Sequence, residues 1–205
     1  PVRGMGWLAA RLEHATRRTI QNEFVAGAVT VFLVLLVGGS IAYGLVAAAH
    51  SIHAAIGHAA SILLIYFCIA GQDLMKHAMN VYRALQRQDI PEARRRVGMM
   101  VGRDTAELDK RGIARATVES VAESMVDGLT GPLFYALLFG PVGAVLYRAT
   151  NTMDSMVGYR NETYARFGWA AARLDDALNF IPARLTAPLI LIAGLCFGRS
   201  RFHLA

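Results

Sequence analysis

Residues 24–72 read FVAGAVTVFLVLLVGGSIAYGLVAAAHSIHAAIGHAASILLIYFCIAGQ, without a single Asp, Glu, Lys or Arg. A helix that crosses a bilayer needs roughly 20 predominantly apolar residues, so this stretch is long enough to cross twice. A soluble chain of 205 residues would have little else with which to cover it. The sequence therefore predicts an all-α, polytopic membrane protein. Its first two spans, Phe24 to about Ala49 and about Ile52 to Gln72, are expected to form a hairpin.

The charged residues that flank this hairpin are mostly basic. The net charge is +6, and the 21 basic residues include only two lysines, Lys76 and Lys110. Such a balance could indicate a nucleic-acid partner, but basic flanks of membrane spans normally lie on the cytoplasmic side. We therefore expect the lipid bilayer and no nucleic acid as a partner. The predicted location is the inner membrane of the cell, with several passes and an active cytoplasmic face.

The rest of the chain divides by composition within what we expect to be one membrane domain, residues 1–205. Because the chain begins without Met and ends on a short apolar run, we expect an internal piece of a longer protein. Within residues 73–130, Asp89 is predicted to cap a helix that has Pro91 in its first turn. The predicted segments are a basic amphipathic flank (1–23), the hairpin (24–72), a cytoplasmic helical loop (73–130), a broken apolar segment with a polar signature (131–184) and a truncated span (185–205).

A row of acids follows the turn at Gly112. A helix from about Ala114 would place Glu119, Glu123 and Asp127 near one face. Like charges four residues apart oppose helix formation by roughly 0.2–0.5 kcal/mol per pair, so the row must be solvated, paired with Arg or neutralised by a cation such as Mg²⁺. A solvated face remains the alternative. The basic residues that would offset it are Arg103, Arg111 and Arg115, and Asp104 is an alternative helix cap.

Residues 131–147 carry no charge but are interrupted by Gly140-Pro141. A complete crossing here would put the acidic row and the polar stretch that follows on opposite sides of the membrane. We therefore predict a re-entrant or broken hairpin, which is tolerated where protein surrounds it. Both acid sets would then share one pocket.

Residues 151–184 read NTMDSMVGYRNETYARFGWAAARLDDALNFIPAR, an unusually polar stretch between apolar segments. Membrane-type sequence keeps acids, amides and guanidinium groups only where they face one another, water or a ligand. We expect Pro182 to end this helix. The alternatives are that Asn151 is a helix cap and that Arg173 and Asp176 form a structural ion pair. The pairs at helical spacing are Asn151 with Asp154, Arg173 with Asp176, and Asp175 with Asn179.

Several blocks resemble the CobD/CbiB family, the integral-membrane adenosylcobinamide-phosphate synthases of cobalamin biosynthesis. They are GRDT (102–105), RATVESVAESMVDG (115–128), PLFYALL and the run 151–187. The resemblance implies ATP-dependent amide formation between adenosylcobyric acid and aminopropanol or its O-phosphate, with ATP and Mg²⁺ as cofactors. It also implies a corrinoid partner and association with other membrane proteins of the cobalamin pathway. One departure is Ser124, where the family usually has Asn.

The motif and the helical spacing together give the candidate site. The predicted catalytic residues are Glu119, Glu123, Asp127, Asp154, Asp175 and Asp176, of which Asp154 and Asp176 are the candidate metal ligands. The predicted substrate- and phosphate-binding residues are Arg103, Asp104, Arg115, Asn151, Tyr159, Arg173, Asn179 and Arg184.

Two other classes of function remain open on the residues alone. Without the family resemblance, a transporter or channel component with a carboxylate pathway would rank first. A non-catalytic membrane scaffold for pathway enzymes is the third possibility. No Walker-type phosphate loop and no dinucleotide fingerprint is present in the sequence, so no motif locates ATP.

Overall fold

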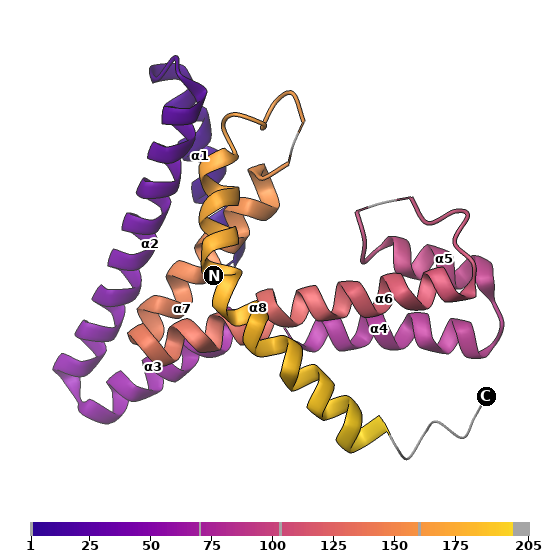
Figure 1. Ribbon diagram of the computed structural model, residues 1–205. Coiled ribbons are helices and arrows are strands. Elements are labelled where there is room, and N and C mark those ends of the chain that lie inside the picture. The colour runs from indigo at the N-terminus through magenta and orange to yellow at the C-terminus, as the bar shows by residue number, and fades with distance from the viewer. Residues whose placement is uncertain (1, 70, 103, 160, 199–205) are drawn as a thin grey trace. The chain divides into compact units, whose positions relative to one another are not determined.

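The computed structural model describes residues 2–69, 71–102, 104–159 and 161–198, and these residues form helices and connecting loops without strands (Figure 1). The elements, in chain order, are α1 (Val2–Thr19), α2 (Glu23–Ile52), α3 (Ala54–Cys68), α4 (Gly71–Gln86), α5 (Ile90–Gly98), α6 (Lys110–Met125), the π-helix η1 (Val126–Thr130), α7 (Gly131–Val157) and α8 (Trp169–Gly198).

The chain folds as two compact units. The first contains Pro1–Ile69 and Gly131–Pro182, and the second contains Ala70–Thr130 and Ala183–Ala205. The first unit therefore holds α1, α2, α3, α7 and the amino-terminal part of α8, and the second holds α4, α5, α6 and η1. The single membrane domain expected from the sequence stays a prediction.

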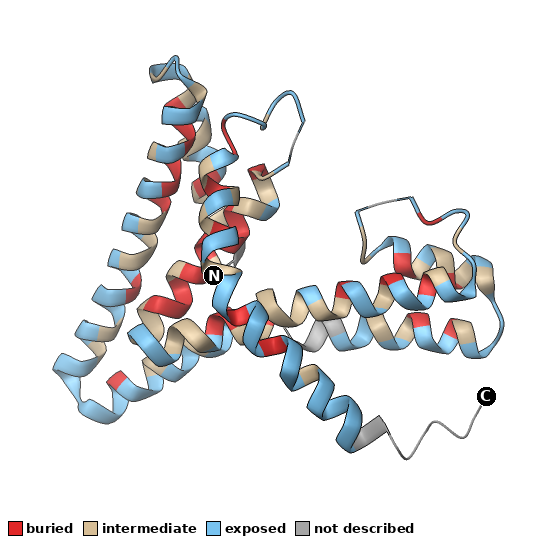
Figure 2. Ribbon diagram, viewed as in Figure 1, coloured by how far each residue is buried: buried red, intermediate tan, exposed pale blue. Residues whose placement is uncertain are grey.

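The apolar hairpin of the first unit is α2 followed by α3. The two helices are separated at His53, whose backbone is extended and whose Nδ1 accepts a hydrogen bond from the Ala55 amide. Much of α2 is exposed, as the pale blue of its ribbon shows (Figure 2). Large apolar residues are among its exposed positions, including Leu36, Ile41 and Leu45, each more than half exposed. A helix keeps such a face only where lipid or another apolar surface covers it.

Helix α7 reverses direction at Gly140. This residue has φ 65° and ψ −159°, a conformation open essentially to glycine, and Pro141 follows it. The reversal brings Tyr147 back to the start of the helix: its ring stacks on Tyr135 at 5.3 Å, and a Cβ at Gly131 would overlap it. In a straight helix, residues 131 and 147 would lie about 24 Å apart. Of the predicted re-entrant or broken hairpin, the break and the reversal are therefore present.

Helix α8 differs from the prediction, because Pro182 lies within it and does not end it. A proline inside a helix leaves the carbonyl four residues earlier without its N–H donor. That carbonyl belongs to Leu178, and the Tyr135 hydroxyl donates to it at 3.0 Å. The apolar run expected as a separate truncated span is thus the continuation of the helix that carries the polar signature.

The second unit has its own apolar core, formed by α4, α5 and α6 around Val81, Val97 and Ile113. Asp89 caps α5, as predicted, by accepting from the Glu92 amide at 3.0 Å. Helix α6 begins at Lys110 and not near Ala114. The reason is a missed cap: Asp109 accepts a hydrogen bond from the Gly112 amide at 2.7 Å, so Gly112 lies in the first turn.

Three helical stretches of the described chain are long and apolar enough to cross a membrane: Glu23–Ile52, Lys110–Val157 and Trp169–Cys196. Helix α3 is apolar but shorter. The fold class predicted from the sequence, an all-α polytopic membrane protein with a hairpin and a broken helix, is confirmed.

Candidate functional site

A chain of hydrogen bonds links α7 to α8 inside the first unit. The Tyr147 hydroxyl lies 2.6 Å from Oδ1 of Asn179, to which it donates, and the Asn179 Nδ2 donates to Oδ2 of Asp175 at 2.8 Å. Tyr147 is 1% exposed and Asp175 is 8% exposed. A buried carboxylate is costly unless polar groups surround it, so this arrangement fixes the position of the Asp175 carboxylate.

Two local features of the sequence bring these three side chains together. Asp175 and Asn179 are four residues apart on α8, so their side chains lie on one face of the helix. Tyr147 reaches them because the reversal at Gly140 places the second arm of α7 against α8, and glycine at position 131 leaves room for its ring. Tyr147 was not among the residues predicted from the sequence. A tyrosine in an apolar run carries no signal of its own.

The second arm of α7 adds further buried polar groups. Asn151 is 8% exposed and accepts a hydrogen bond from Nη1 of Arg148 at 3.3 Å. It lies within α7, so it does not cap the helix. Thr150 and Thr152 are also buried, and their hydroxyls donate to backbone carbonyls of the same helix. The unit therefore keeps amide, guanidinium and carboxylate groups within a largely apolar interior.

The two predicted metal ligands lie in different surroundings. Asp154 is partly buried near the end of α7, where its backbone carbonyl accepts from the Gly158 amide. Asp176 is exposed and lies 3.5 Å from Nη1 of Arg173, which gives the structural ion pair considered as an alternative. Among the described residues, no three His, Cys, Asp or Glu side chains are grouped so as to hold a metal ion. The Mg²⁺ site stays a prediction.

A segment that we call the strap, residues 158–168, connects α7 to α8 and contains the predicted binding residue Tyr159, which is exposed. Arg17 of α1 contacts this segment: its Nη2 donates to the Thr163 carbonyl at 3.0 Å. Arg17 belongs to the predicted basic amphipathic flank (1–23), for which the sequence indicated no contact with the polar signature, and the structure adds this contact. The sequence did contain one sign that Arg17 is held in place: Glu13 lies four residues earlier in the same helix and forms an ion pair with Arg17 at 3.0 Å.

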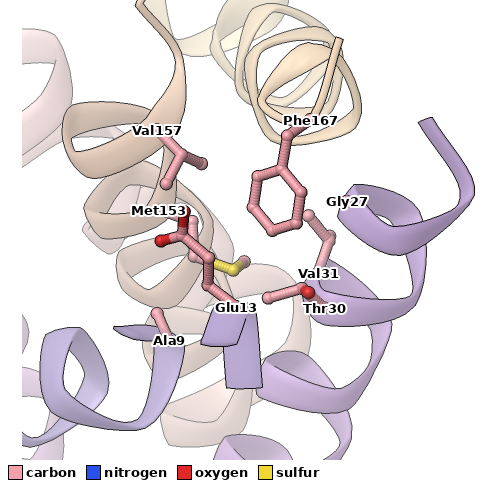
Figure 3. Close-up of a pocket in the computed structure, with 8 residues that line it drawn as sticks. All are labelled: Ala9, Glu13, Gly27, Thr30, Val31, Met153, Val157 and Phe167. Carbon is pink, nitrogen blue, oxygen red and sulfur yellow. The ribbon is translucent and has the colours of Figure 1, made fainter. Parts of the chain in front are cut away.

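A small cavity of about 10 Å³ lies beside these contacts (Figure 3), close to the smallest volume that holds one water molecule. Most of its walls are apolar, and Glu13 and Thr30 supply the polar groups. Its size excludes a nucleotide or a corrinoid. The lining residues are Ala9, Glu13, Gly27, Thr30, Val31, Met153, Val157 and Phe167.

The remaining predicted residues belong to the second unit. Glu119 is exposed and receives a hydrogen bond from Arg115 at 2.7 Å, Glu123 is exposed, and Asp127 lies in the π-helix η1. Asp104 accepts from the Ala106 amide, which forms a local turn. Arg184 is exposed on α8, and Arg103 lies outside the described residues. Convergence of these acids with those of the first unit stays a prediction.

Comparison with known proteins gives a consistent family assignment. The family model described as CobD/Cbib protein matches residues 1–204. A cobalamin biosynthesis protein CobD from Leptospira interrogans is 44% identical over 97% of this chain and 63% of its own length. Proteins of the same name from Pelobacter propionicus and Clostridium perfringens are 41% and 42% identical, over 100% and 94% of this chain and 64% and 62% of their own lengths.

The chain thus spans a little under two thirds of the length of these curated relatives. No solved structure matches it. A family model that matches nearly every residue, together with relatives above 40% identity, settles the assignment. The chain belongs to the CobD/Cbib protein family.

Proposed function

We propose that this chain is the greater part of an adenosylcobinamide-phosphate synthase-like ligase of cobalamin biosynthesis. The observation that carries the proposal is the buried sequence of hydrogen bonds from Tyr147 through Asn179 to Asp175. Asp175 and Asn179 lie in the stretch 151–187 that resembles the family signature, and the relatives carry the name cobalamin biosynthesis protein. Because a hydrogen bond from Asn179 holds Oδ2 of this buried carboxylate in place, it supports our proposal that Asp175 acts as a base.

The reaction that we propose joins the free propionate of adenosylcobyric acid to the amine of aminopropanol or its O-phosphate. The new bond is carbon to nitrogen, and one carboxylate oxygen leaves. Because a carboxylate is a poor acyl donor, ATP would phosphorylate it, giving an acyl phosphate and ADP. Attack by the amine would then release inorganic phosphate, which carries that oxygen away. The amine is an ammonium ion at neutral pH and must lose a proton before it attacks.

We propose that the carboxylate of Asp175 accepts this proton from the ammonium group. Its Oδ2 is held by Asn179, and Asn179 is in turn held by Tyr147. These two residues are positioning residues, since they act through the carboxylate. Asn151, which is buried, and Arg148, which is partly buried, are suited to bind an oxygen-rich or anionic part of a substrate. Arg173 and Asp176 form an ion pair with each other at the surface, so we propose Asp175 and not Asp176 as the proton acceptor.

ATP and Mg²⁺ remain part of the proposal through the family resemblance. When bound, they would supply the activated carboxyl group. Since the described residues offer no three-ligand group, we derive no step through the metal. We also propose that the acidic residues of α6 and η1 belong to the catalytic set, and that the active face is cytoplasmic in the inner membrane. Association with other membrane proteins of the pathway belongs to the same proposal.

The test is product formation by the purified full-length protein with adenosylcobyric acid, aminopropanol phosphate and MgATP, followed by mass spectrometry. We expect Asp175→Asn to lower kcat by about 10²–10⁴-fold, the usual contribution of general acid–base catalysis. Asp176→Asn is the comparison variant, because it changes the neighbouring, exposed carboxylate, which the sequence also places in the catalytic set. The substituted proteins should retain their helical content.

Wild-type turnover by Asp175→Asn would contradict the proposal that Asp175 is the base. Complete loss of turnover in both variants would support the prediction from the sequence that Asp176 is also catalytic. Absence of amide product together with cation flux into liposomes would contradict the ligase and favour the transporter.

A further inference from the structure

The strap, whose described residues are 158, 159 and 161–168, connects the two helices that carry Asp154 and Asp175. At its start, the Gly158 amide donates to the Asp154 carbonyl of α7 at 2.7 Å. At its end, the Gly168 carbonyl accepts from the Ala172 amide of α8 at 3.0 Å, and the Gly168 amide donates to the Tyr164 carbonyl within the strap at 2.7 Å. A Cβ at Gly168 would overlap the Val157 carbonyl, so the two ends of the strap lie against each other.

The middle of the strap is held by Arg17 from α1. Besides the hydrogen bond to the Thr163 carbonyl at 3.0 Å, the guanidinium carbon lies 4.2 Å from the ring centre of Phe167 and 5.4 Å from that of Tyr164. Both separations are within the range of cation–π attraction. One side chain thus contacts three residues of the strap at its backbone and at two rings.

Two carboxylates set the direction of that guanidinium. Nε of Arg17 donates to Glu13 at 3.0 Å, and Nη1 donates to Glu23 at 2.7 Å. Glu13 lies one turn earlier on α1 and Glu23 opens α2, so the three residues join α1, α2 and the strap. Hydrogen bonds between charged groups are about twice as strong as neutral ones. This number of directed contacts exceeds what a solvated basic flank would make.

Lysine cannot reproduce these contacts. Arginine presents donors in a planar fork and stacks on aromatic rings, whereas the ammonium group of lysine is a point charge. The next residue, Arg18, is exposed, and no hydrogen bond or ion pair of its side chain is found among the described residues. Arg17 and Arg18 therefore make a matched pair of neighbouring arginines in different surroundings.

We propose that Arg17 is a positioning residue that fixes the strap for the binding of the corrinoid substrate, an inference that rests on the proposed function. Contacts of Arg17 lie at residues 163, 164 and 167. Nearer the start of the strap, Tyr159, Asn161 and Glu162 are exposed. The phenol of Tyr159, the amide of Asn161 and the carboxylate of Glu162 can donate to and accept from the polar groups of a substrate.

The test compares wild type, Arg17→Lys and Arg18→Lys, each as the full-length protein in detergent micelles. Hydrogen–deuterium exchange reports on the strap, and steady-state kinetics reports KM and kcat. For Arg17→Lys we expect amide exchange in residues 161–168 to rise at least tenfold and KM for adenosylcobyric acid to rise about tenfold, with kcat within twofold. Arg18→Lys should match wild type in every measurement.

A milder variant keeps the test valid if Arg17→Lys folds poorly. Glu23→Gln removes one of the two carboxylates that direct Arg17 and should shift exchange and KM in the same direction by a smaller factor. Unchanged exchange of the strap in both variants would overturn the proposal. Faster exchange with unchanged KM would overturn its substrate-binding part. Wild-type protein without amide product would contradict the proposed function, while the exchange measurement would still decide whether Arg17 holds the strap.

Discussion

Tyr135 donates its phenolic hydrogen to the carbonyl oxygen of Leu178 at 3.0 Å, and Leu178 lies four residues before Pro182. In a regular helix this carbonyl would accept from the amide of residue 182, which proline lacks. The first arm of the α7 hairpin therefore supplies the donor that α8 is missing. Because Asp175 and Asn179 lie in the same part of α8, this bond helps to fix the segment that carries the candidate site.

The first prediction concerns Tyr135→Phe. Removing the hydroxyl leaves the Leu178 carbonyl without this donor, and an unsatisfied buried polar group costs about 1–3 kcal/mol. We expect the free energy of unfolding in detergent micelles to fall by about that amount. Pro182→Ala restores an amide at position 182, so the double variant should lose less than the sum of the single changes. Additive losses would show that the hydroxyl does not replace the missing helical donor.

A second prediction concerns Tyr147→Phe, which deletes the hydroxyl that donates to Asn179 at 2.6 Å. Asn179 would then hold Asp175 less firmly, and amide formation should fall by about 10-fold to 100-fold even though the buried ring is preserved. The pH dependence of kcat should shift as well, because the surroundings of the proposed base change. Tyr43→Phe, at a tyrosine that is 69% exposed on α2, is the control and should leave both properties unchanged.

The third prediction concerns the reversal of α7. Gly140→Ala adds a methyl group that meets no neighbouring atom, yet the backbone there has φ 65° and ψ −159°. The cost is therefore conformational, about 1–3 kcal/mol. Gly44→Ala is the matched control: its Cβ also meets nothing, but the residue is in a regular helix. Alanine there should be neutral or stabilising by up to about 1 kcal/mol. Equal thermal midpoints for the two variants would contradict the proposed cost at Gly140.

The features that the sequence predicts correctly are those with local causes. The absence of charged residues over 24–72 correctly indicates the α2–α3 hairpin, and Gly140-Pro141 correctly indicates the break in α7. Local reasoning fails at Pro182, because the donor that keeps α8 intact comes from Tyr135, 43 residues away. It fails at Arg17 for the same reason, since the strap lies 146 residues further along the chain. Helical spacing correctly joined Asp175 to Asn179 but carried no sign of Tyr147.

The last prediction concerns pH. Hydrogen bonds from Arg95 and then Arg96 lower the pKa of Glu92 from 4.5 to about 2. A carboxylate with a lowered folded-state pKa contributes stability that is fully present above its unfolded value and is lost as the pH falls toward the folded value. Glu92→Gln should therefore lower the thermal midpoint slightly near pH 6, and the difference from wild type should shrink between pH 4.5 and 2. Because these side chains reach solvent, 1 M salt should also reduce the difference at pH 6. A carboxyl titration of Glu92 by NMR with a midpoint near 4.5 would contradict the ion pair directly.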